Sequence, residues 1–454
     1  MSLLGAALAA VVVGAPVSAA GPEELTGVGG KYLYFSATDD DTGRELWRSA
    51  GTAENTFLVK DINPAGGSHP KWLADIGGTL FFQADDGTRG QELWKSDGTV
   101  GGTKRVKDIR SGILPSNPSD LTAFGSTAYF VAQDGSTGKE LWKSDGTANG
   151  TKRVKDIRIG AKGSDPEELT RVGKTLFFTA DLGSPLQQGD RELWKTDGTA
   201  KGTKRVKDIY LGAAGSNPED LTKVGNTLFF IGYDLTAGSE LWKSDGTESG
   251  TKRVKNINPG VANSDPRDLT SVGGLVFFTA DDGTHGRELW RSDGTASGTR
   301  MVEDIRPGTS GGGLSASGSL VNVGGTLFLI ADDGTSGREL WKSDGTRSGT
   351  KRVKNIGPDA TSGASTPIVA VGSTAYFVGD QDATGMELWK SDGTAAGTEP
   401  VKDIRAGAGD ALIDGLTRVG TRSFLVADDG IHGLEIWTSD GSEEGTELVR
   451  DIDP

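Results

Sequence analysis

The hydrophobic residues of this chain fall in short runs separated by polar and glycine-containing segments, and the same arrangement recurs along almost the whole sequence. One copy contains four such runs, at 220–225, 227–232, 240–245 and 251–257. Short alternating or aromatic runs of this length predict half-buried β-strands. The glycines between them are typical of tight turns between antiparallel strands. Each copy therefore predicts a four-stranded meander.

The unit occurs nine times, and a tryptophan in its third run marks the period. Successive tryptophans are 48 residues apart, except for intervals of 47, 52 and 51. A period near 48 with no helical pattern is typical of propeller blades. We expect an all-β fold, a β-propeller of four-stranded antiparallel blades, with a nine-bladed ring preferred and an eight-bladed or split ring as the alternative. The tryptophans, which we expect to pack between blades, are Trp47, Trp94, Trp142, Trp194, Trp242, Trp290, Trp341, Trp389 and Trp437.

The first twenty residues differ from the rest of the chain. Their apolar stretch is interrupted by Pro16 and ends in Val17-Ser18-Ala19, which resembles a signal-peptidase site, although no Lys or Arg precedes it. The stretch is short for a membrane span. We therefore expect a signal-peptide-like segment at 1–20, a single propeller at 21–454, and a secreted, extracellular or cell-surface protein, with the periplasm as an alternative.

The amino-acid composition argues against several classes of partner and of functional site. The net charge of −15 argues against nucleic acid as a partner, because phosphate contacts need clustered Lys and Arg. The chain has no cysteine, which excludes disulfides, thiol catalysis and cysteine-ligated zinc, and its three histidines make a multi-histidine metal site improbable. The 70 glycines recur at fixed offsets and therefore indicate turns rather than disorder.

Two segments of the repeat resemble motifs of known protein families. "ELWKSDGT" resembles the signature of the bacterial ELWxxDGT repeat family, and the likeness covers essentially the whole chain after residue 20. That resemblance implies a secreted repeat protein of propeller type. The segment 132–142, "AQDGSTGKELW", is also similar to the tryptophan-docking motif of pyrroloquinoline-quinone dehydrogenases, which implies locking of neighbouring blades. The adjacent cysteines of those enzymes have no counterpart here, so their activity is not implied.

Residues present in every copy are better explained as scaffold than as a site. The glutamate before each Leu-Trp pair could be a catalytic carboxylate, but we favour an ion pair with Lys or Arg between blades. "SDGT" predicts an Asx-turn, with calcium binding as the alternative, for which "DQDATG" at 380–385 comes nearest. "KRVK" on an outermost strand predicts a charged edge that prevents sheet-to-sheet aggregation.

Function is expected where the copies differ. Every copy spans fifteen residues from its tryptophan to the isoleucine of its fourth strand, whereas the hairpin at 181–190 and the link at 306–319 are lengthened. In an up-and-down blade these two connections lie on one face, and varying loops on one face often mark a binding surface. His285 and His432 also fall on such hairpins, where each is more simply an exposed turn residue.

The position just before the first-strand leucine gives the candidate site. Copies seven to nine carry Ser319, Pro367 and Gly415 there. If first strands line the channel, the residues of the first six copies form an acidic arc interrupted by one tryptophan at one channel mouth. The alternative is turn chemistry at the strand entry after Asn-Pro or Asp-Pro. The candidate ligand-binding residues are Glu24, Trp72, Asp120, Glu168, Asp220 and Asp268.

Three classes of function follow. We favour a non-enzymatic binding or adhesion scaffold that presents one variable face to a protein or carbohydrate ligand. The alternative is a lectin, since the indole of Trp72 beside acceptors suits a sugar. A propeller enzyme (a hydrolase, lyase or quinoprotein-like protein) is less favoured, because the sequence offers carboxylates and isolated histidines without a converging acid–base set. No catalytic residue and no cofactor are predicted, calcium excepted, and the oligomeric state is left open.

Overall fold

The computed structural model describes residues 21–183, 189–211, 214–308, 314, 320–358, 361–381 and 383–452. The signal-peptide-like segment 1–20, Ser319, Asp382 of "DQDATG" and parts of the two lengthened loops lie outside these residues. Among the described residues, no helix is long and apolar enough to cross a membrane.

Within the described ranges, 36 strands form nine four-stranded sheets, each built from four consecutive antiparallel strands, so the nine-bladed ring is confirmed and the eight-bladed and split alternatives are wrong. Blades 1 to 3 contain β1 (Glu23–Val28), β2 (Tyr32–Asp39), β3 (Gly43–Ser49), the short 3-10 helix η1 (Ala53–Asn55), β4 (Phe57–Lys60), β5 (Lys71–Ile76), β6 (Thr79–Asp85), β7 (Gln91–Ser96), β8 (Lys104–Lys107), β9 (Ser119–Phe124), β10 (Thr127–Gln133), β11 (Lys139–Ser144) and β12 (Lys152–Arg153). Blades 4 to 6 contain β13 (Glu167–Val172), β14 (Thr175–Asp181), β15 (Arg191–Thr196), β16 (Lys204–Arg205), β17 (Glu219–Val224), β18 (Thr227–Asp234), β19 (Gly238–Ser244), β20 (Lys252–Arg253), β21 (Arg267–Val272), β22 (Leu275–Asp281), β23 (Arg287–Ser292) and β24 (Arg300–Glu303). Blades 7 to 9 contain β25 (Leu320–Val323), β26 (Thr326–Asp332), β27 (Arg338–Ser343), β28 (Lys351–Arg352), β29 (Ala364–Val371), β30 (Thr374–Asp380), β31 (Met386–Ser391), β32 (Glu399–Lys402), β33 (Asp414–Val419), β34 (Arg422–Asp428), β35 (Leu434–Ser439) and β36 (Glu447–Arg450).

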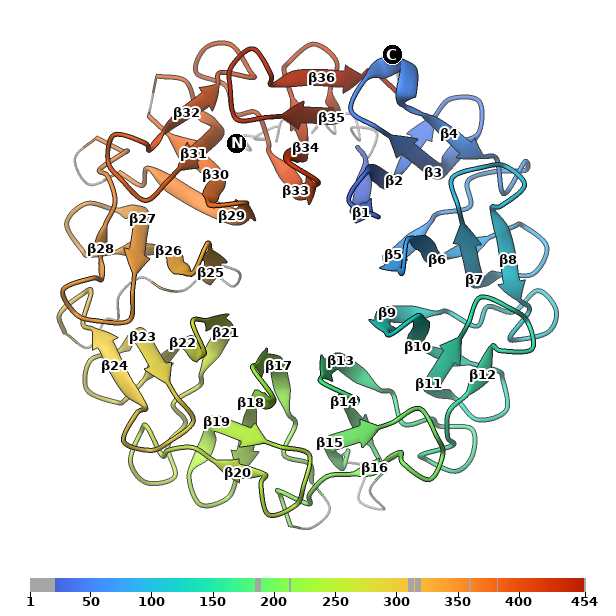
Figure 1. The fold of residues 1–454 in the computed structure, drawn as a ribbon, viewed down its shortest axis with the longest axis horizontal. Coiled ribbons are helices and arrows are strands. Elements are labelled where there is room, and N and C mark those ends of the chain that lie inside the picture. The colour runs from blue at the N-terminus through green and yellow to red at the C-terminus, as the bar shows by residue number, and fades with distance from the viewer. Residues whose placement is uncertain are drawn as a thin grey trace, which may run out of the picture.

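The blades stand in a closed ring around a central channel, with the first strand of each blade innermost and the fourth outermost (Figure 1). The hydrophobic core lies between adjacent blades rather than inside them. Trp94 of β7, for example, packs against Leu46, Val59 and Ile62 of blade 1. The other eight repeated tryptophans take part in equivalent clusters around the ring. Eight of the nine tryptophans are buried and Trp341 is partly buried, so the series packs its indoles at the blade interfaces.

The glutamate before each Leu-Trp pair is buried and hydrogen-bonded to the segment that follows strand four. The carboxylate of Glu240, which is fully buried, accepts hydrogen bonds from the backbone N–H of Ile257 at 3.0 Å and from the Ser264 hydroxyl at 2.8 Å. Burial raises the pKa of Glu240 to about 7, although these hydrogen bonds oppose the shift. The expected ion pair between blades is therefore wrong for this glutamate, which fastens the link to the third strand.

The second lysine of "KRVK" joins neighbouring blades. Lys107 Nζ donates a hydrogen bond to the carbonyl of Thr151 in the next blade at 2.8 Å. At the ring closure, Arg450 Nη1 donates to the carbonyl of Thr56 at 2.7 Å. Blades 1 and 9 each supply all four strands of their own sheet. Blade 9 therefore contacts blade 1 through such side-chain hydrogen bonds and a shared hydrophobic cluster.

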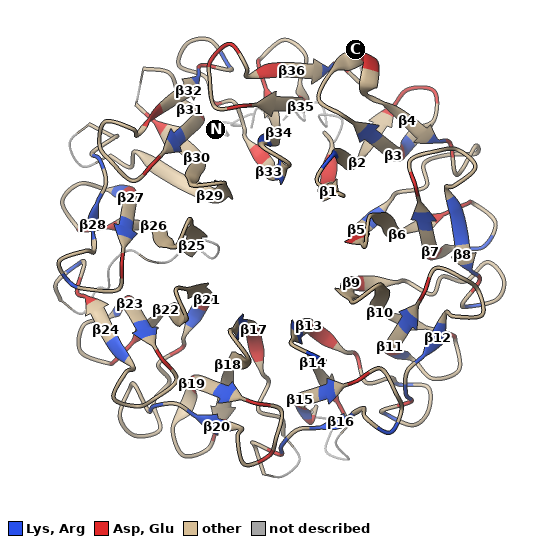
Figure 2. Cartoon of the chain, viewed as in Figure 1, with Lys and Arg blue, Asp and Glu red and all other residues tan. Residues whose placement is uncertain are grey.

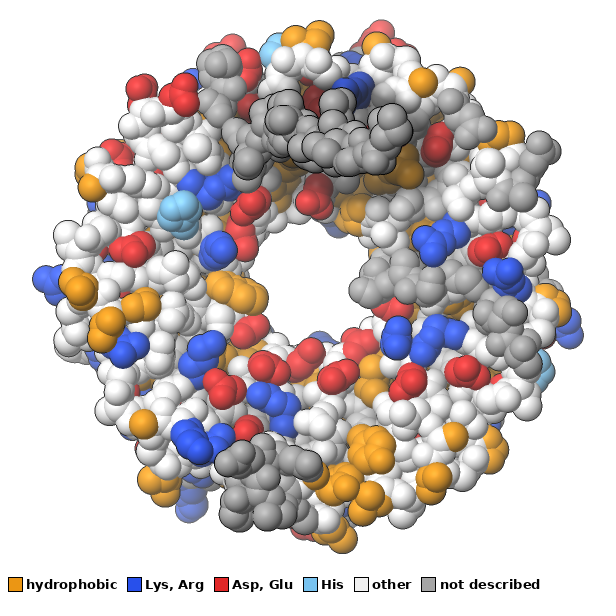
Figure 3. Space-filling view, turned by 180° about the vertical axis from the view of Figure 1, so that it is seen from behind, with side chains coloured by type: hydrophobic (Ala, Val, Ile, Leu, Met, Phe, Trp, Pro, Cys, Tyr) orange, Lys and Arg blue, Asp and Glu red, His pale blue; other side chains and the backbone are white. Residues whose placement is uncertain are grey.

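Strand order places the loops on two different faces. The links between blades and the hairpins between strands two and three lie together. The N–H of Ser116 in a link donates to the carbonyl of Gln91 at 3.0 Å, and the N–H of Gln133 donates to the carbonyl of Ser116 at 3.0 Å. The SDGT hairpins lie on the opposite face, where Asp97 Oδ1 accepts from the N–H of Thr99 at 3.0 Å, an Asx-turn as expected. We call the face of links and second hairpins the variable face; Figure 3 looks onto it.

Candidate functional site

The six candidate residues occupy one equivalent position, a β-bulge in the first strand of their blades. In β17 the pairing with β18 shifts register between Glu219 and Thr222, so the bulge contains Asp220. All six have φ between 53° and 61°, the left-handed region that residues other than glycine rarely adopt. Gly415 takes the same conformation in blade 9, with φ 58°, and the peptide bond before Pro367 of blade 8 is cis.

Three carboxylates at this position, Glu24, Glu168 and Asp220, accept hydrogen bonds from the backbone of the next blade. Glu24 Oε2 accepts a hydrogen bond from the N–H of Trp72 at 2.8 Å, and Asp220 Oδ2 accepts one from the N–H of Leu269 at 2.7 Å. The alternative interpretation, local turn chemistry at the strand entry, therefore explains too little. The carboxylates connect adjacent blades at the channel wall, and this connection fixes where their side chains lie.

The bulge places these residues in an arc on the channel wall. Figure 2 shows acidic residues on the inner strands β1, β13 and β17, and Figure 3 shows acidic side chains along the rim of the channel on the variable face. Trp72 is 44% exposed among them. Two cavities adjoin at Glu168, which lines both. The smaller, of about 390 Å³, is lined by Glu24, Trp72, Asp120 and Glu168, and the larger, of about 710 Å³, by Glu168, Asp220 and Asp268.

Burial raises the pKa of two members of this arc, Asp220 and Asp120. The pKa of Asp220 rises to about 6, chiefly because the side chain is buried and further because Glu168 and Asp268 are nearby, while the N–H of Leu269 opposes the shift. Burial also raises the pKa of Asp120, against a hydrogen bond from Ser119. Carboxylates that repel one another in a partly desolvated cavity gain from a cation that enters it.

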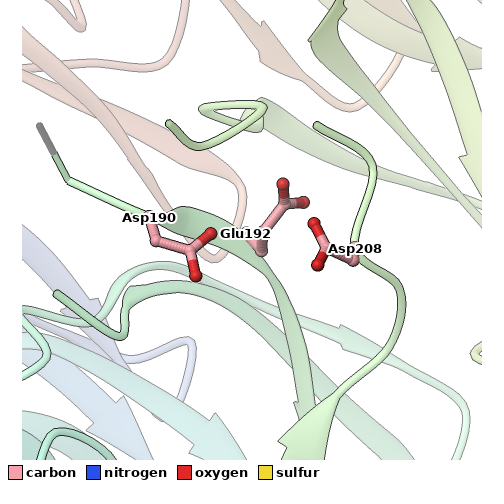
Figure 4. Close-up of side chains that lie close together, drawn as sticks. All are labelled: Asp190, Glu192 and Asp208. Atoms are coloured by element: carbon pink, nitrogen blue, oxygen red, sulfur yellow. The ribbon is translucent and has the colours of Figure 1, made fainter. Parts of the chain in front are cut away.

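A second acidic cluster lies in blade 4, where the carboxylate oxygens of Asp190, Glu192 and Asp208 come within 4.8 Å of one another (Figure 4). Arg205 already supplies a counter-charge, with Nη1 3.5 Å from Asp190 Oδ2 and Nη2 3.0 Å from Asp208 Oδ2. Glu192 is fully buried and accepts hydrogen bonds from Ser216 Oγ at 2.6 Å and the N–H of Ser216. These contacts tie the cluster to the blade, while Asp190 Oδ1 and Asp208 Oδ1 are buried without a hydrogen-bond partner among the described residues. Its sequence signal is Asp190, which stands where copy two has a glycine.

The two hairpin histidines lie apart from the arc. His285 Nδ1 is 2.8 Å from Asp282 Oδ2 in blade 6, and His432 Nδ1 is 2.7 Å from Asp429 Oδ2 in blade 9. Each pairs with an aspartate of its own hairpin, which raises the pKa of each histidine. Neither they nor His69 line either cavity, so among the described residues no histidine lies with the candidate carboxylates there.

Exposed apolar side chains are distributed unequally between the two faces. Of the twelve large exposed hydrophobic residues in the described ranges, Val100 lies in an SDGT hairpin and Trp72 lines the channel. The remaining ten lie in or beside the links and second hairpins of the variable face: Ile113, Leu114, Ile159, Leu211, Tyr233, Leu235, Val261, Met386, Leu412 and Ile431. In the described ranges, the variable face therefore carries more exposed apolar residues than the opposite face.

No family model and no curated protein matches this chain. Among solved structures, it is similar to a puromycin hydrolase (15% identity, TM-score 0.41) and to a puromycin-hydrolyzing peptidase of Mycobacterium tuberculosis (11%, 0.41); each similarity covers 84% of this chain and 60% of the other. It is also similar to the β-propeller domain of the Trilobed protease from Pyrococcus furiosus (11%, 0.36), over 73% of this chain and 94% of that domain. The chain thus spans about 60% of the length of the hydrolytic enzymes it resembles. At these values the likeness supports no assignment of activity.

Proposed function

We propose that this protein is a non-enzymatic binding scaffold, secreted or at the cell surface, that receives its ligand at the channel mouth of the variable face. The observation that carries the proposal is the convergence of all six candidate residues on two adjoining cavities. The gathering of exposed apolar residues on the same face supports it. The extracellular location rests on the signal-like segment 1–20 and on the resemblance to the ELWxxDGT repeat family.

The site favours binding over catalysis. Its polar groups include carboxylates held by backbone N–H groups of the next blade, and the two paired histidines lie on hairpins outside both cavities. A hydrolase or lyase needs an acid, a base and an oxyanion or cation stabiliser that converge on one reacting atom. Carboxylates beside an exposed indole serve instead to hold a cationic or hydroxyl-rich ligand.

A carbohydrate ligand is the second candidate, and Trp72 favours it. The indole shares the smaller cavity with Glu24, Asp120 and Glu168. Sugar rings present C–H groups to an aromatic face and hydroxyl groups to carboxylate acceptors, so one exposed tryptophan beside such acceptors fits a pyranose.

Ligand screens of the full chain test the scaffold proposal. We would screen a glycan array and a peptide array, and measure calcium binding by calorimetry. We expect at least one ligand whose affinity falls by about tenfold or more in Trp72→Ala or Asp120→Asn. Val100→Ser, an exposed position on the opposite face, is the matched control and should leave binding unchanged.

The outcome separates the candidates. A glycan that is lost in Trp72→Ala establishes the lectin alternative, and a peptide or calcium ligand lost in either variant establishes a scaffold of another class. If every ligand found binds both variants as tightly as the unaltered protein, or if no ligand is found, the channel mouth is not the site and the proposal is wrong.

A further inference from the structure

Blade 5 differs from other blades at the contact between a link and the second strand that follows it. In three other blades this contact is an ion pair between an arginine of the link and an aspartate near the end of strand two of the next blade. The pairs, with their Nη1–Oδ2 distances, are Arg158–Asp181 at 3.1 Å, Arg306–Asp332 at 3.2 Å and Arg405–Asp428 at 2.9 Å. The aligned residues of blade 5 are Tyr210 and Tyr233, whose rings stack with their centroids 5.8 Å apart.

The exchange replaces a hydrated ion pair by exposed apolar surface. Tyr233 is 38% exposed, and the neighbouring Leu211 and Leu235 are 77% and 60% exposed. Blade 5 lies at the lower left of Figure 1, and the reverse view in Figure 3 shows hydrophobic side chains gathered at the lower right, over the same blade. Exposed apolar residues that lie together in this way are typical of a contact surface.

This apolar surface continues into the larger channel cavity. Ile231, which lines the cavity, precedes Tyr233 by two residues on β18, so both side chains point to the same face of the sheet. The strand register pairs Tyr233 with Ser239, which also lines the cavity. The hairpin of blade 5 and the channel wall therefore form one continuous surface.

The channel end of that surface is strongly acidic. Two of its carboxylates are held by the backbone: Glu168 accepts from the N–H of Leu221 at 3.3 Å, and Asp220 accepts from the N–H of Leu269 at 2.7 Å. The ionisable residues that line the cavity are Glu168, Glu219, Asp220, Asp265, Asp268 and Arg267. Five carboxylates against one guanidinium make a formal charge of −4, which complements a basic group.

We propose that blade 5 docks a polypeptide segment of a partner protein, with a lysine or arginine side chain in the cavity beside Asp220 and apolar side chains against Tyr210, Tyr233 and Leu235. The inference rests on the proposed scaffold function and names the class of partner. Leu211 and Leu235 favour a polypeptide over a glycan, because apolar side chains gain free energy when they are buried there. Sugar hydroxyls would lose water on the same surface without gaining hydrogen-bond partners.

Fluorescence anisotropy with three short labelled peptides tests this inference on the full chain. The first peptide alternates lysine with leucine, the second lysine with serine, and the third glutamate with leucine. We expect the lysine–leucine peptide to bind most tightly, because it alone satisfies both the acidic cavity and the apolar surface.

The sharpest variant restores the ion pair that three other blades use. Tyr210→Arg combined with Tyr233→Asp rebuilds the repeated ion pair, so the blade should fold normally. It is expected to weaken the lysine–leucine peptide by about tenfold and to leave the lysine–serine peptide nearly unchanged. Glu168→Gln should weaken both lysine peptides, and Val100→Ser on the opposite face should change neither.

Three results would overturn the inference: equal affinity of the double variant and the unaltered protein for the lysine–leucine peptide, equal affinity of the unaltered protein for both lysine peptides, or a glycan that loses binding in the double variant. The two proposals fail separately. A ligand that depends on Trp72 while the peptide does not bind leaves the scaffold function standing. A peptide that depends on blade 5 while Trp72→Ala and Asp120→Asn change nothing moves the site away from the smaller cavity.

Discussion

At the scale of single residues, the chain uses tryptophan in two opposite ways. Trp94 is 5% exposed and fills a blade interface. Trp72 is 44% exposed and has φ 57° in the bulge of β5, where an L-residue costs roughly 1–2 kcal/mol. Gly415 holds the aligned position in blade 9 without that cost. A large side chain kept in an unfavourable conformation at a solvent-accessible channel wall is better explained by binding than by stability.

Two substitutions compare these roles. Trp72→Gly removes the strain of the left-handed conformation and adds the conformational entropy that glycine loses on folding, so the free energy of unfolding should change by less than about 1 kcal/mol. Trp94→Ala opens a cavity between blades and should cost about 3–5 kcal/mol. Urea denaturation followed by circular dichroism measures both. If Trp72→Gly destabilises the protein as much as Trp94→Ala, Trp72 is a packing residue and its assignment to a site is wrong.

At the scale of strands and hairpins, neighbouring blades exchange more polar contacts than the sequence indicates. The SDGT hairpin is the expected Asx-turn, because its hydrogen bonds are local and follow from residue order. The sequence predicts a charged outer edge for the "KRVK" strand. The structure adds a hydrogen bond from its second lysine to a carbonyl of the next blade. A contact across blades depends on the ring geometry, which the residues of one copy do not contain.

The two lysines of β8 provide a matched test of this difference. Lys107→Met removes a hydrogen bond from a charged donor to the carbonyl of Thr151 and should lower the free energy of unfolding by about 1–2 kcal/mol. Lys104→Met, on the same strand but exposed, should change it by less than about 0.5 kcal/mol. Thermal and urea denaturation of both variants measures the two changes in the free energy of unfolding. Equal changes would mean that "KRVK" acts only as a charged edge.

At the scale of the whole molecule, the period of the sequence predicts the fold, and the alignment of the nine copies identifies the candidate residues. The period near 48 and the repeated tryptophan were sufficient to predict nine blades. The arc was visible because six aligned positions carried Glu, Asp or Trp. The left-handed bulge was not predicted, since those residue types rarely adopt positive φ and Gly415 was the single clue. The stacked pair Tyr210 and Tyr233 was also missed, because its members come from two copies and meet only in the ring.

The ring as a whole also predicts an unusual dependence of stability on pH. Burial raises the pKa of four repeated glutamates to about 7: Glu92, Glu240, Glu288 and Glu387. In the unfolded chain these carboxyls titrate near 4.5, so between these values the folded protein binds more protons than the unfolded one. Stability therefore falls as pH rises from about 4.5 to 7, and the stabilising contribution of these glutamates is fully present at the acidic end of that range.

Other carboxylates limit the effect at lower pH. The aspartates of the SDGT hairpins, such as Asp97 and Asp245, have lowered pKa values because a threonine hydroxyl and N–H hydrogen-bond to them, so their contribution is lost under stronger acid. The melting temperature should therefore be highest near pH 5 and lower at pH 8, as scanning calorimetry at constant ionic strength would measure. Glu240→Gln removes one titrating group and should flatten the fall between pH 5 and 8. A melting temperature that rises steadily from pH 5 to pH 8 would show that the buried glutamates remain ionised and that their hydrogen bonds outweigh the cost of burial.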